Sequence, residues 1–231
     1  YENHLFIGAE LKPLLLVEGY DLVEGKDYDL IYTDNYNVGT ANVSIVFKNN
    51  YSGEYTKSFT IEQVVVGENA TIEIDSSDQY FKDEEIEVEV VVKVGEYVLN
   101  KNVDYVVNYL DNYYPGTAIV QVRSGDNCVV SGDYYFTILA KPITVTTEDI
   151  NFDADSVSAC DMSLVSYTVD GLLEGNRIEF EILESDYTVY IKGIYNDEDV
   201  NLKYYYDITY DVVGKVHIFR TNYYHDDSGN H

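Results

Sequence analysis

Several residue types are scarce in this sequence of 231 residues. Tryptophan is absent, and the chain has one methionine, two cysteines and three prolines. The cysteines, Cys128 and Cys160, form no cluster with the spacing of zinc ligands, which argues against a structural zinc site. They are either a disulfide or two inert thiols. The thiols are favoured, because nothing in the sequence brings the two Cα atoms within the roughly 4.4 to 6.8 Å that a disulfide requires.

Basic residues are also scarce. Fourteen Lys and Arg stand against 42 Asp and Glu, which gives a formal net charge of −28. Nucleic acids and anionic membrane surfaces are bound through Lys and Arg, so we expect neither as a partner. No apolar run of about 18 residues occurs, so we expect no membrane insertion. The chain opens at Tyr1 without a basic and then apolar segment, and we expect it to be a fragment of a longer protein.

One stretch of the sequence occurs twice. Residues 26–43 contain Asp-Tyr, Tyr, Asp-Asn, Gly-Thr-Ala and Val, and residues 103–120 contain the same residues at an offset of 77. The offset continues without a gap to residues 59–61 and 136–138, which both read Phe-Thr-Ile. A match of this length predicts a tandem array of units of roughly 70 to 80 residues rather than one large domain.

The residue types and their alternation predict an all-β fold. Val, Ile, Tyr, Phe and Thr dominate the apolar and borderline positions, and these residues suit a pleated sheet. Residues 40–47 alternate with period 2, which is typical of a strand with one buried face. Residues 20–23, between two glycines, are expected to form a short strand. Polar turns about every 8 to 12 residues then favour small β-sandwich modules.

The repeat sets the expected domain boundaries. Repeat 1 covers residues 1–62, repeat 2 covers 63–140, a third module covers 141–222, and the polar tail 223–231 is expected to be disordered. Nothing before Tyr1 corresponds to residues 63–79 of repeat 2, so we expect repeat 1 to lack its first strand. The open edge is then a site for a neighbouring segment or chain, and for self-association.

These motifs resemble two families of modules. The pattern of repeat 1 resembles the tandem immunoglobulin-like repeats of bacterial cell-surface proteins, and repeat 2 keeps most of it. In repeat 1 the pattern is Gly25-Lys26-Asp27-Tyr28, Tyr32, Asn35, Gly39-Thr40-Ala41-Asn42-Val43, Asn50-Tyr51-Ser52-Gly53 and Phe59-Thr60-Ile61. The third module looks like the mucin-binding glue modules found beside adhesive domains. Its matching residues are Gly171-Leu172-Leu173-Glu174-Gly175-Asn176 and Tyr206-Asp207-Ile208-Thr209-Tyr210.

The resemblance implies immunoglobulin-like β-sandwich modules, with β-grasp-like modules as the alternative, above all for the third. It carries no catalytic residues. The four histidines are scattered, and no Ser/His/Asp or Cys/His arrangement can be proposed from the sequence. We therefore expect no enzymatic activity.

Acidic clusters are candidates for calcium, the only cofactor considered. Calcium takes about six to eight oxygen ligands, often from closely spaced carboxylates. One cluster is Asp149, Asp153 and Asp155, and a second lies in the early loops of repeat 2 at Asp75, Asp78, Asp83, Glu84 and Glu85. Neither has the spacing of an EF-hand loop. Solvated turns are the favoured interpretation.

Tyrosine is abundant, with 25 residues. Neighbouring residues of a strand point to opposite faces, so tyrosine pairs on strands place one ring outward. Exposed rings stack on sugars or anchor protein contacts. The candidate ligand-binding residues are Tyr113, Tyr114, Tyr204 and Tyr205. Packing across strands is the favoured alternative.

Together these observations predict a non-catalytic, extracellular segment that spaces or presents an adhesive region of a bacterial surface protein. The alternatives are a module that itself binds a host or cell-surface glycan or protein, and an accessory region of a secreted carbohydrate-active enzyme.

Overall fold

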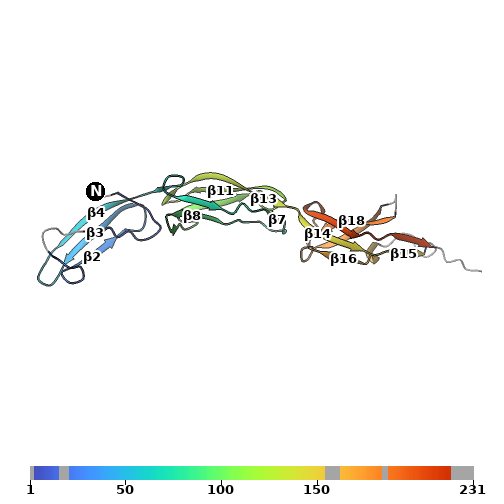
Figure 1. Ribbon diagram of the computed structural model, residues 1–231, viewed down its shortest axis with the longest axis horizontal. Helices are drawn as coiled ribbons and strands as arrows, with labels where there is room; N and C mark the ends of the chain where they lie inside the picture. The colour runs from blue at the N-terminus through green and yellow to red at the C-terminus, as the bar shows by residue number, and fades with distance from the viewer. Residues whose placement is uncertain (1–2, 16–20, 154–161, 184–186, 220–231) are drawn as a thin grey trace, which may run out of the picture. The chain divides into compact units, whose positions relative to one another are not determined.

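The computed structural model describes residues 3–15, 21–153, 162–183 and 187–219. The protein is all-β with 56% strand, and the described ranges contain no α-helix (Figure 1). The only helical turns in these ranges are the short 3₁₀ segments η1 (Met162–Leu164) and η2 (Lys203–Tyr205). The prediction of an all-β fold is confirmed.

The chain divides into two compact units. The N-terminal compact unit comprises Tyr1–Asp78, Ile86–Asn112 and Thr117–Thr137. The C-terminal compact unit comprises Gln79–Glu85, Tyr113–Gly116 and Ile138–His231.

The first sheet contains four strands in the order β1-β4-β3-β2. Their bounds are β1 Asn3–Leu5, β2 Tyr28–Thr33, β3 Gly39–Phe47 and β4 Glu54–Glu62. Neighbouring strands β2, β3 and β4 are antiparallel, whereas β1 is parallel to β4. Ala41, Val43 and Ile45 are buried on one face of β3, as their alternation predicts.

The second four-stranded sheet repeats this arrangement in the order β10-β11-β13-β7. Its strands are β7 Gln79–Tyr80, β10 Tyr105–Leu110, β11 Gly116–Ser124 and β13 Ser131–Leu139. Strands β10, β11 and β13 begin and end 77 residues after β2, β3 and β4, for example at 105 and 28. The sequence offset is therefore an offset between whole strands.

The short strands β1 and β7 occupy the same place in the two sheets. β1 lies parallel to the end of β4, and β7 lies parallel to the end of β13. Phe6 and Phe81 follow these strands, are fully buried, and donate their amides to Glu62 and Leu139. Phe6 and Phe81 are 75 residues apart, two fewer than the offset of 77 between the main strands. The edge of β4 in repeat 1 is thus paired with β1.

Repeat 2 has further strands that face its four-stranded sheet. A second sheet has the order β6-β8-β9, with bounds Thr71–Ile74, Val90–Val94 and Tyr97–Val98. The hydroxyl of Tyr105 on β10 donates to the carbonyl of Val90 on β8 at 2.9 Å, which joins the two sheets through the core. A separate parallel pair joins β5 (Val64–Val65) to β12 (Cys128–Val129). Among the described residues of repeat 1, no strand corresponds to β5 or β6.

The short strand expected at residues 20–23 is wrong for its described part, since residues 21–23 form no strand. The amide of Val23 instead donates to a carboxylate oxygen of Asp27 at 3.0 Å, and the amide of Asp27 donates to the carbonyl of Val23. The acidic side chain closes a tight loop here, because it offers the backbone an alternative to a ladder partner.

The third module is built around β14 (Lys141–Thr147). This strand pairs antiparallel with β16 (Tyr167–Asp170) and parallel with β19 (Tyr206–Val212). β15 (Ile150–Asp153) pairs parallel with β20 (Val216–Phe219). β17 (Arg177–Leu183) and β18 (Thr188–Tyr195) form an antiparallel pair. The tail predicted to be disordered, residues 223–231, lies outside the described residues.

Gly214 lies between β19 and β20, where the chain passes from the parallel pair β14–β19 to the parallel pair β15–β20. A Cβ atom there would lie 2.0 Å from the carbonyl oxygen of Glu148, so only glycine fits. The close approach lets the amide of Gly214 donate to the buried hydroxyl of Thr147 at 2.7 Å. The chain passes from β14 to β15 beside this contact.

Candidate functional site

The two copies of the Asp-Asn-Tyr stretch form equivalent loops, residues 34–40 and 111–117. Each loop starts with an aspartate of positive φ, 55° at Asp34 and 54° at Asp111. Each reaches the next strand through a glycine, Gly39 or Gly116, with φ of 138° or 147° that other residues rarely adopt. The backbone of the loop is therefore set by the repeated residues themselves.

Buried amides hold both loops in place. The side chain of Asn35 donates to the carbonyl of Leu11 at 2.9 Å, and the amide of Leu11 donates to the carbonyl of Asn35. Asn112 makes the same two hydrogen bonds with Ile86. Asn35 and Asn112 are nearly fully buried, so these bonds satisfy polar groups that would otherwise be costly.

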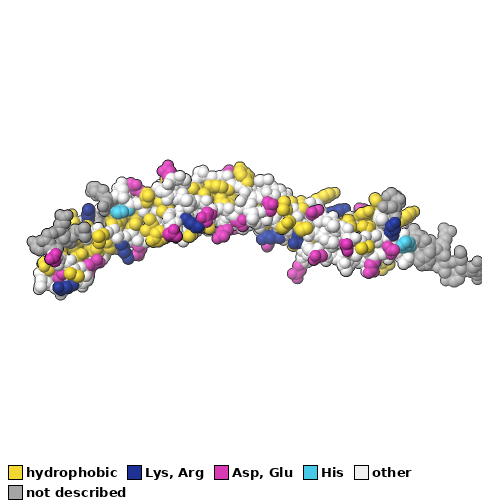
Figure 2. Space-filling view, viewed as in Figure 1, with side chains coloured by type: hydrophobic (Ala, Val, Ile, Leu, Met, Phe, Trp, Pro, Cys, Tyr) yellow, Lys and Arg dark blue, Asp and Glu magenta, His cyan; other side chains and the backbone are white. Residues whose placement is uncertain are grey.

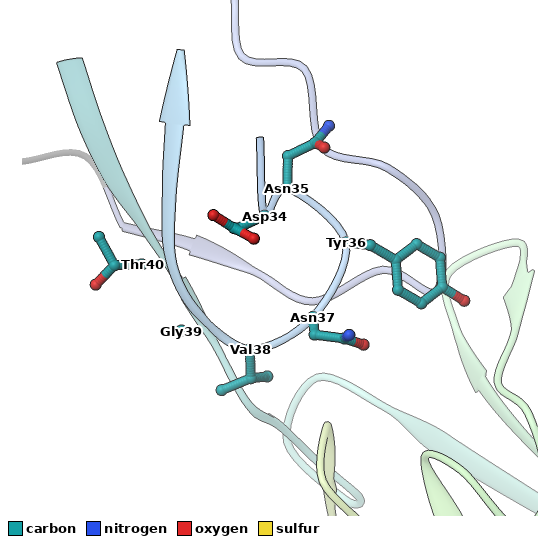
Figure 3. Close-up of a pocket in the computed structure, with 7 residues that line it drawn as sticks. All are labelled: Asp34, Asn35, Tyr36, Asn37, Val38, Gly39 and Thr40. Atoms are coloured by element: carbon teal, nitrogen blue, oxygen red, sulfur yellow. The ribbon is translucent and has the colours of Figure 1, made fainter. Parts of the chain in front are cut away.

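Each loop carries a tyrosine that packs on the phenylalanine after the short parallel strand. The rings of Phe6 and Tyr36 lie edge to face with centroids 5.9 Å apart, and those of Phe81 and Tyr113 do the same at 6.3 Å. Figure 3 shows Tyr36 projecting from one side of its loop, while Asp34 and Thr40 lie on the other. The loop itself, residues 34–40, lines an open hollow of about 340 Å³.

The tyrosine hydroxyls have different partners. Tyr36 donates to the carbonyl of Gly8 at 3.4 Å, which is a weak hydrogen bond. Tyr113 contacts Asp83, with the hydroxyl 2.7 Å from a carboxylate oxygen. This hydrogen bond, together with burial, raises the pKa of Tyr113 to about 12.

Within the N-terminal compact unit, the loop of repeat 1 contacts repeat 2. The amide of Val38 donates to Oδ1 of Asn127 at 2.9 Å, and Nδ2 of Asn127 donates to Oδ1 of Asn37 at 3.1 Å. The side chain of Asn100 donates to the hydroxyl of Tyr36 at 3.2 Å. We call these contacts the first joint.

Asn127 is the central residue of the first joint. It is 1% exposed, and its Nδ2 also donates to a carboxylate oxygen of Asp104 at 2.7 Å. The other carboxylate oxygen of the fully buried Asp104 accepts the amide of Asn100 at 2.7 Å. One side chain thus connects a buried carboxylate of repeat 2 to the loop of repeat 1.

Within the C-terminal compact unit, the second loop meets the third module through aromatic rings. Tyr114 lies 4.7 Å from Tyr113 and 4.8 Å from Tyr205, measured between ring centroids. Phe81 lies 5.2 Å from Tyr205 and 6.0 Å from Tyr206. We call this cluster the second joint.

A hydrogen bond extends the second joint. The side chain of Asn196 donates to Oδ2 of Asp83 at 3.3 Å, on the carboxylate whose other oxygen meets Tyr113. Asp83 was named above in an acidic cluster, but its oxygens face a phenol and an amide. Asp83 lies in the second joint because it is two residues after Phe81, whose ring contacts Tyr205.

Three of the four tyrosines predicted to bind a ligand come together in the second joint. Tyr113, Tyr114 and Tyr205 contact one another in a chain of rings, whereas Tyr204 is 86% exposed. The sequence interpretation did not include Phe81. The signal for it was the pair Phe6 and Phe81, which the offset of 77 hides because this pair is 75 residues apart.

The calcium candidates are placed only in part. Asp149 accepts the amide of Lys215 at 2.8 Å on one carboxylate oxygen, and the other lies 3.0 Å from Nε2 of His217. These hydrogen bonds lower the pKa of Asp149. The side chain of Asp153 and all of Asp155 lie outside the described residues. Over the ranges that the structure describes, no three His, Cys, Asp or Glu side chains gather as a metal site.

The acidic cluster of repeat 2 is also engaged locally. Asp75 accepts the amide of Ser77 at 2.9 Å. The side-chain hydrogen bond from Ser77 and this backbone hydrogen bond lower the pKa of Asp75. Glu84 forms an ion pair with Lys82 at 3.0 Å. These contacts are typical of solvated turns.

Cys128 is a free thiol and is fully buried beside β5. Burial, with the nearby charge of Asp104, raises the pKa of Cys128 to about 11. Cys160 lies outside the described residues.

A second open hollow, about 390 Å³, lies in the third module. Tyr190 and Tyr210 line it with an edge-to-face contact of 5.4 Å, and Ile208, Lys203 and Glu181 contribute to its wall. The hydroxyl of Tyr210 accepts the amide of Ile191 at 2.9 Å, so this ring is also held against β18.

Within the described ranges, no helix has the length and apolar character required to cross a membrane. No protein-family model matches the chain, and no curated protein shows significant similarity to it.

Proposed function

We propose that the chain is a non-catalytic, extracellular segment of a bacterial cell-surface protein that spaces or presents an adhesive region. It consists of two immunoglobulin-like β-sandwich repeats, residues 1–62 and 63–140, and a mucin-binding-glue-like module from residue 141. This proposal combines the resemblance of the repeated motif with the contacts that the motif makes.

The observation that supports the proposal best is the use of the repeated loop. In repeat 1 the loop meets Asn127 and Asn100 of the next repeat. In repeat 2 the equivalent loop meets Tyr205 of the third module. A loop that binds a soluble ligand keeps its recognition groups free, whereas these loops use theirs to contact the next module. The repeated motif therefore fits a role in joining modules.

The charge of the chain suits a segment that stays dispersed in solution. Figure 2 shows acidic side chains spread over the visible face rather than gathered at one spot. With a net charge of −28, the chain repels anionic surfaces and other copies of itself, which favours solubility. Exposed ion pairs such as Lys93 with Glu73 contribute little to stability, so the charge acts mainly through repulsion.

Mechanical unfolding tests this proposal. If each module forms a core of its own, as we propose, a chain held at both ends should unfold in discrete steps. Since an extended chain spans about 3.4 Å per residue, repeat 1 (residues 1–62) should lengthen it by about 210 Å and repeat 2 (residues 63–140) by about 265 Å. Two such steps, and a third from the last module, are the expected result. One step for the whole chain, or extension without steps, would contradict a tandem spacer.

Direct ligand binding is the second candidate function, and the hollow at Tyr190 and Tyr210 favours it. Two tyrosine rings beside a lysine and a glutamate offer stacking and polar groups to a sugar. A glycan array probed with the full chain tests this candidate. Binding that Tyr190→Ala abolishes and Tyr204→Ala leaves intact would support it, and no binding above background would remove it.

Calcium stays a proposal for the region after residue 148. The oxygens of Asp149 already meet Lys215 and His217, so we expect the same melting temperature in calcium and in chelator. A higher melting temperature in calcium would instead support a site there.

A further inference from the structure

The first joint buries one end of repeat 2, and the described residues at the equivalent end of repeat 1 are largely exposed. In repeat 2, Leu99, Asn127 and Cys128 are 2%, 1% and 0% exposed. Subtracting 77 gives their counterparts in repeat 1, Leu22, Asn50 and Tyr51. We call Leu22, Val23, Asn50 and Tyr51 the open face of repeat 1.

The open face exposes apolar and amide groups. Tyr51 is 41% exposed and Val23 is 53% exposed, although both are large hydrophobic residues. Asn50 is exposed, whereas its counterpart Asn127 makes three hydrogen bonds. Leu22 and Asn50 keep the residue types of Leu99 and Asn127 without the contacts of the first joint, whereas Val23 and Tyr51 stand in place of Asn100 and Cys128.

Two elements of repeat 1 and the chain after it cover this end of repeat 2. The first is the loop of residues 34–40, through Asn37 and Val38. The second is β5, whose residues Val64 and Val65 pair in parallel with Cys128 and Val129. The amide of Val64 also donates to the carbonyl of Asn127 at 3.2 Å.

Among the described residues of repeat 1, both elements have an exposed counterpart on the open face. Tyr51 and Ser52, which correspond to Cys128 and Val129, are exposed and lie in no strand. The amide of Tyr51 donates to the carbonyl of Lys48, so a parallel strand of the β5 kind would pair with the carbonyls of Asn50 and Ser52. Asn50, the counterpart of Asn127, would supply the side-chain amide that an incoming loop binds. Gly8 shows how close such packing is, because a Cβ on it would lie 3.1 Å from the side chain of Leu99.

We propose that the open face of repeat 1 is a docking surface for another module of the same kind. That module enters with its Asn-Tyr-Asn-Val loop and with the Val-Val segment that follows its last strand. The proposal rests on the proposed function, since it treats the first joint as the rule by which modules connect. Free copies of this chain are not the occupant, because their loops at residues 34–40 and 111–117 are engaged in their own joints.

Hydrogen exchange of a fusion chain tests this docking. Residues 1–75 are placed directly ahead of Tyr1, because the spacing of 75 between Phe6 and Phe81 keeps the short strands in register. The added copy carries Tyr51→Phe, so that its peptides differ in mass from those of the original repeat. The matched control adds Asn37→Ala and Val64→Pro to the added copy, which removes the loop acceptor and the strand donor.

The amide of Ser52 in the original repeat should exchange at least about tenfold more slowly in the fusion than in the natural chain, as expected for a newly formed hydrogen bond. The control should restore fast exchange. Equal exchange at Ser52 in all three chains would overturn the docking proposal, provided Val129 stays protected. Fast exchange at Val129 itself would instead overturn the first joint, and with it the proposed function. A melting curve of each fusion confirms that the added copy is folded.

Discussion

Replacing Asn127 with alanine should weaken the first joint strongly. The substitution removes one hydrogen bond to a buried carboxylate and two to the loop of repeat 1. It leaves the amide of Val38 without its acceptor and the fully buried Asp104 with one donor fewer. Each of the three lost hydrogen bonds lowers the free energy of unfolding.

A hydrogen bond to a charged group contributes about 1.5 to 3 kcal/mol, and a neutral one contributes about 1 kcal/mol. For Asn127→Ala the sum is about 3 to 5 kcal/mol, a large part of the roughly 5 to 15 kcal/mol that stabilises a typical domain. With a urea dependence of about 2 kcal/mol per M, the unfolding midpoint should fall by about 2 M.

Urea unfolding followed by tyrosine fluorescence and by far-UV circular dichroism measures this shift. Asn50→Ala is the matched control, because Asn50 lies 77 residues earlier and is exposed. The control should change stability by less than about 0.5 kcal/mol, as is usual for exposed sites. If both variants lose the same stability, or if Asn127→Ala loses less than about 1 kcal/mol, the role assigned to Asn127 is wrong.

Three further outcomes follow from single residues. The pKa of Tyr113 is about 12 in the folded protein against about 10 when unfolded, so its contribution to folding stability is present below about pH 10 and is lost as the pH rises through 12. Tyr113→Phe should flatten this part of the curve of stability against pH. An unchanged curve would contradict the hydrogen bond to Asp83. In a Cys160→Ser variant, Cys128 should resist a thiol reagent at neutral pH and react once urea unfolds the protein; rapid native labelling would refute its burial. Gly214→Ala should cost about 1 to 3 kcal/mol or more in urea unfolding, because its Cβ meets a main-chain oxygen, and a neutral result would contradict that close approach.

Much of the fold follows from the sequence, because the main strands obey local rules. The alternation of Ala41, Val43 and Ile45 predicts the buried face of β3, and the offset of 77 transfers it to β11. The strand expected between two glycines at residues 20–23 is wrong for residues 21–23, because the amide of Val23 donates to the carboxylate of Asp27 and closes a tight loop instead.

The joints could not be predicted in the same way, because their contacts join residues far apart in the sequence. Asn127 and Val38 are 89 residues apart, and no local pattern states that they meet. The abundance of tyrosine pointed to Tyr113, Tyr114 and Tyr205 as candidates. Their ring contacts with one another could not be predicted, because Tyr205 is distant in the sequence from the other two. The useful signal was the retention of asparagine at both position 50 and position 127, which the offset makes visible.

The chemistry of the joints suits a chain with so much negative charge. Apart from Asp83 and Asp104, whose oxygens accept phenol, amide and backbone donors, the contacts in both joints are made by uncharged groups. Added salt screens repulsion between exposed carboxylates but acts little on buried hydrogen bonds. The stability of the natural chain should therefore rise with salt, while the difference between it and Asn127→Ala stays constant. Urea midpoints of both chains at low and high sodium chloride measure this, and a difference that shrinks with salt would show that the first joint depends on exposed charge.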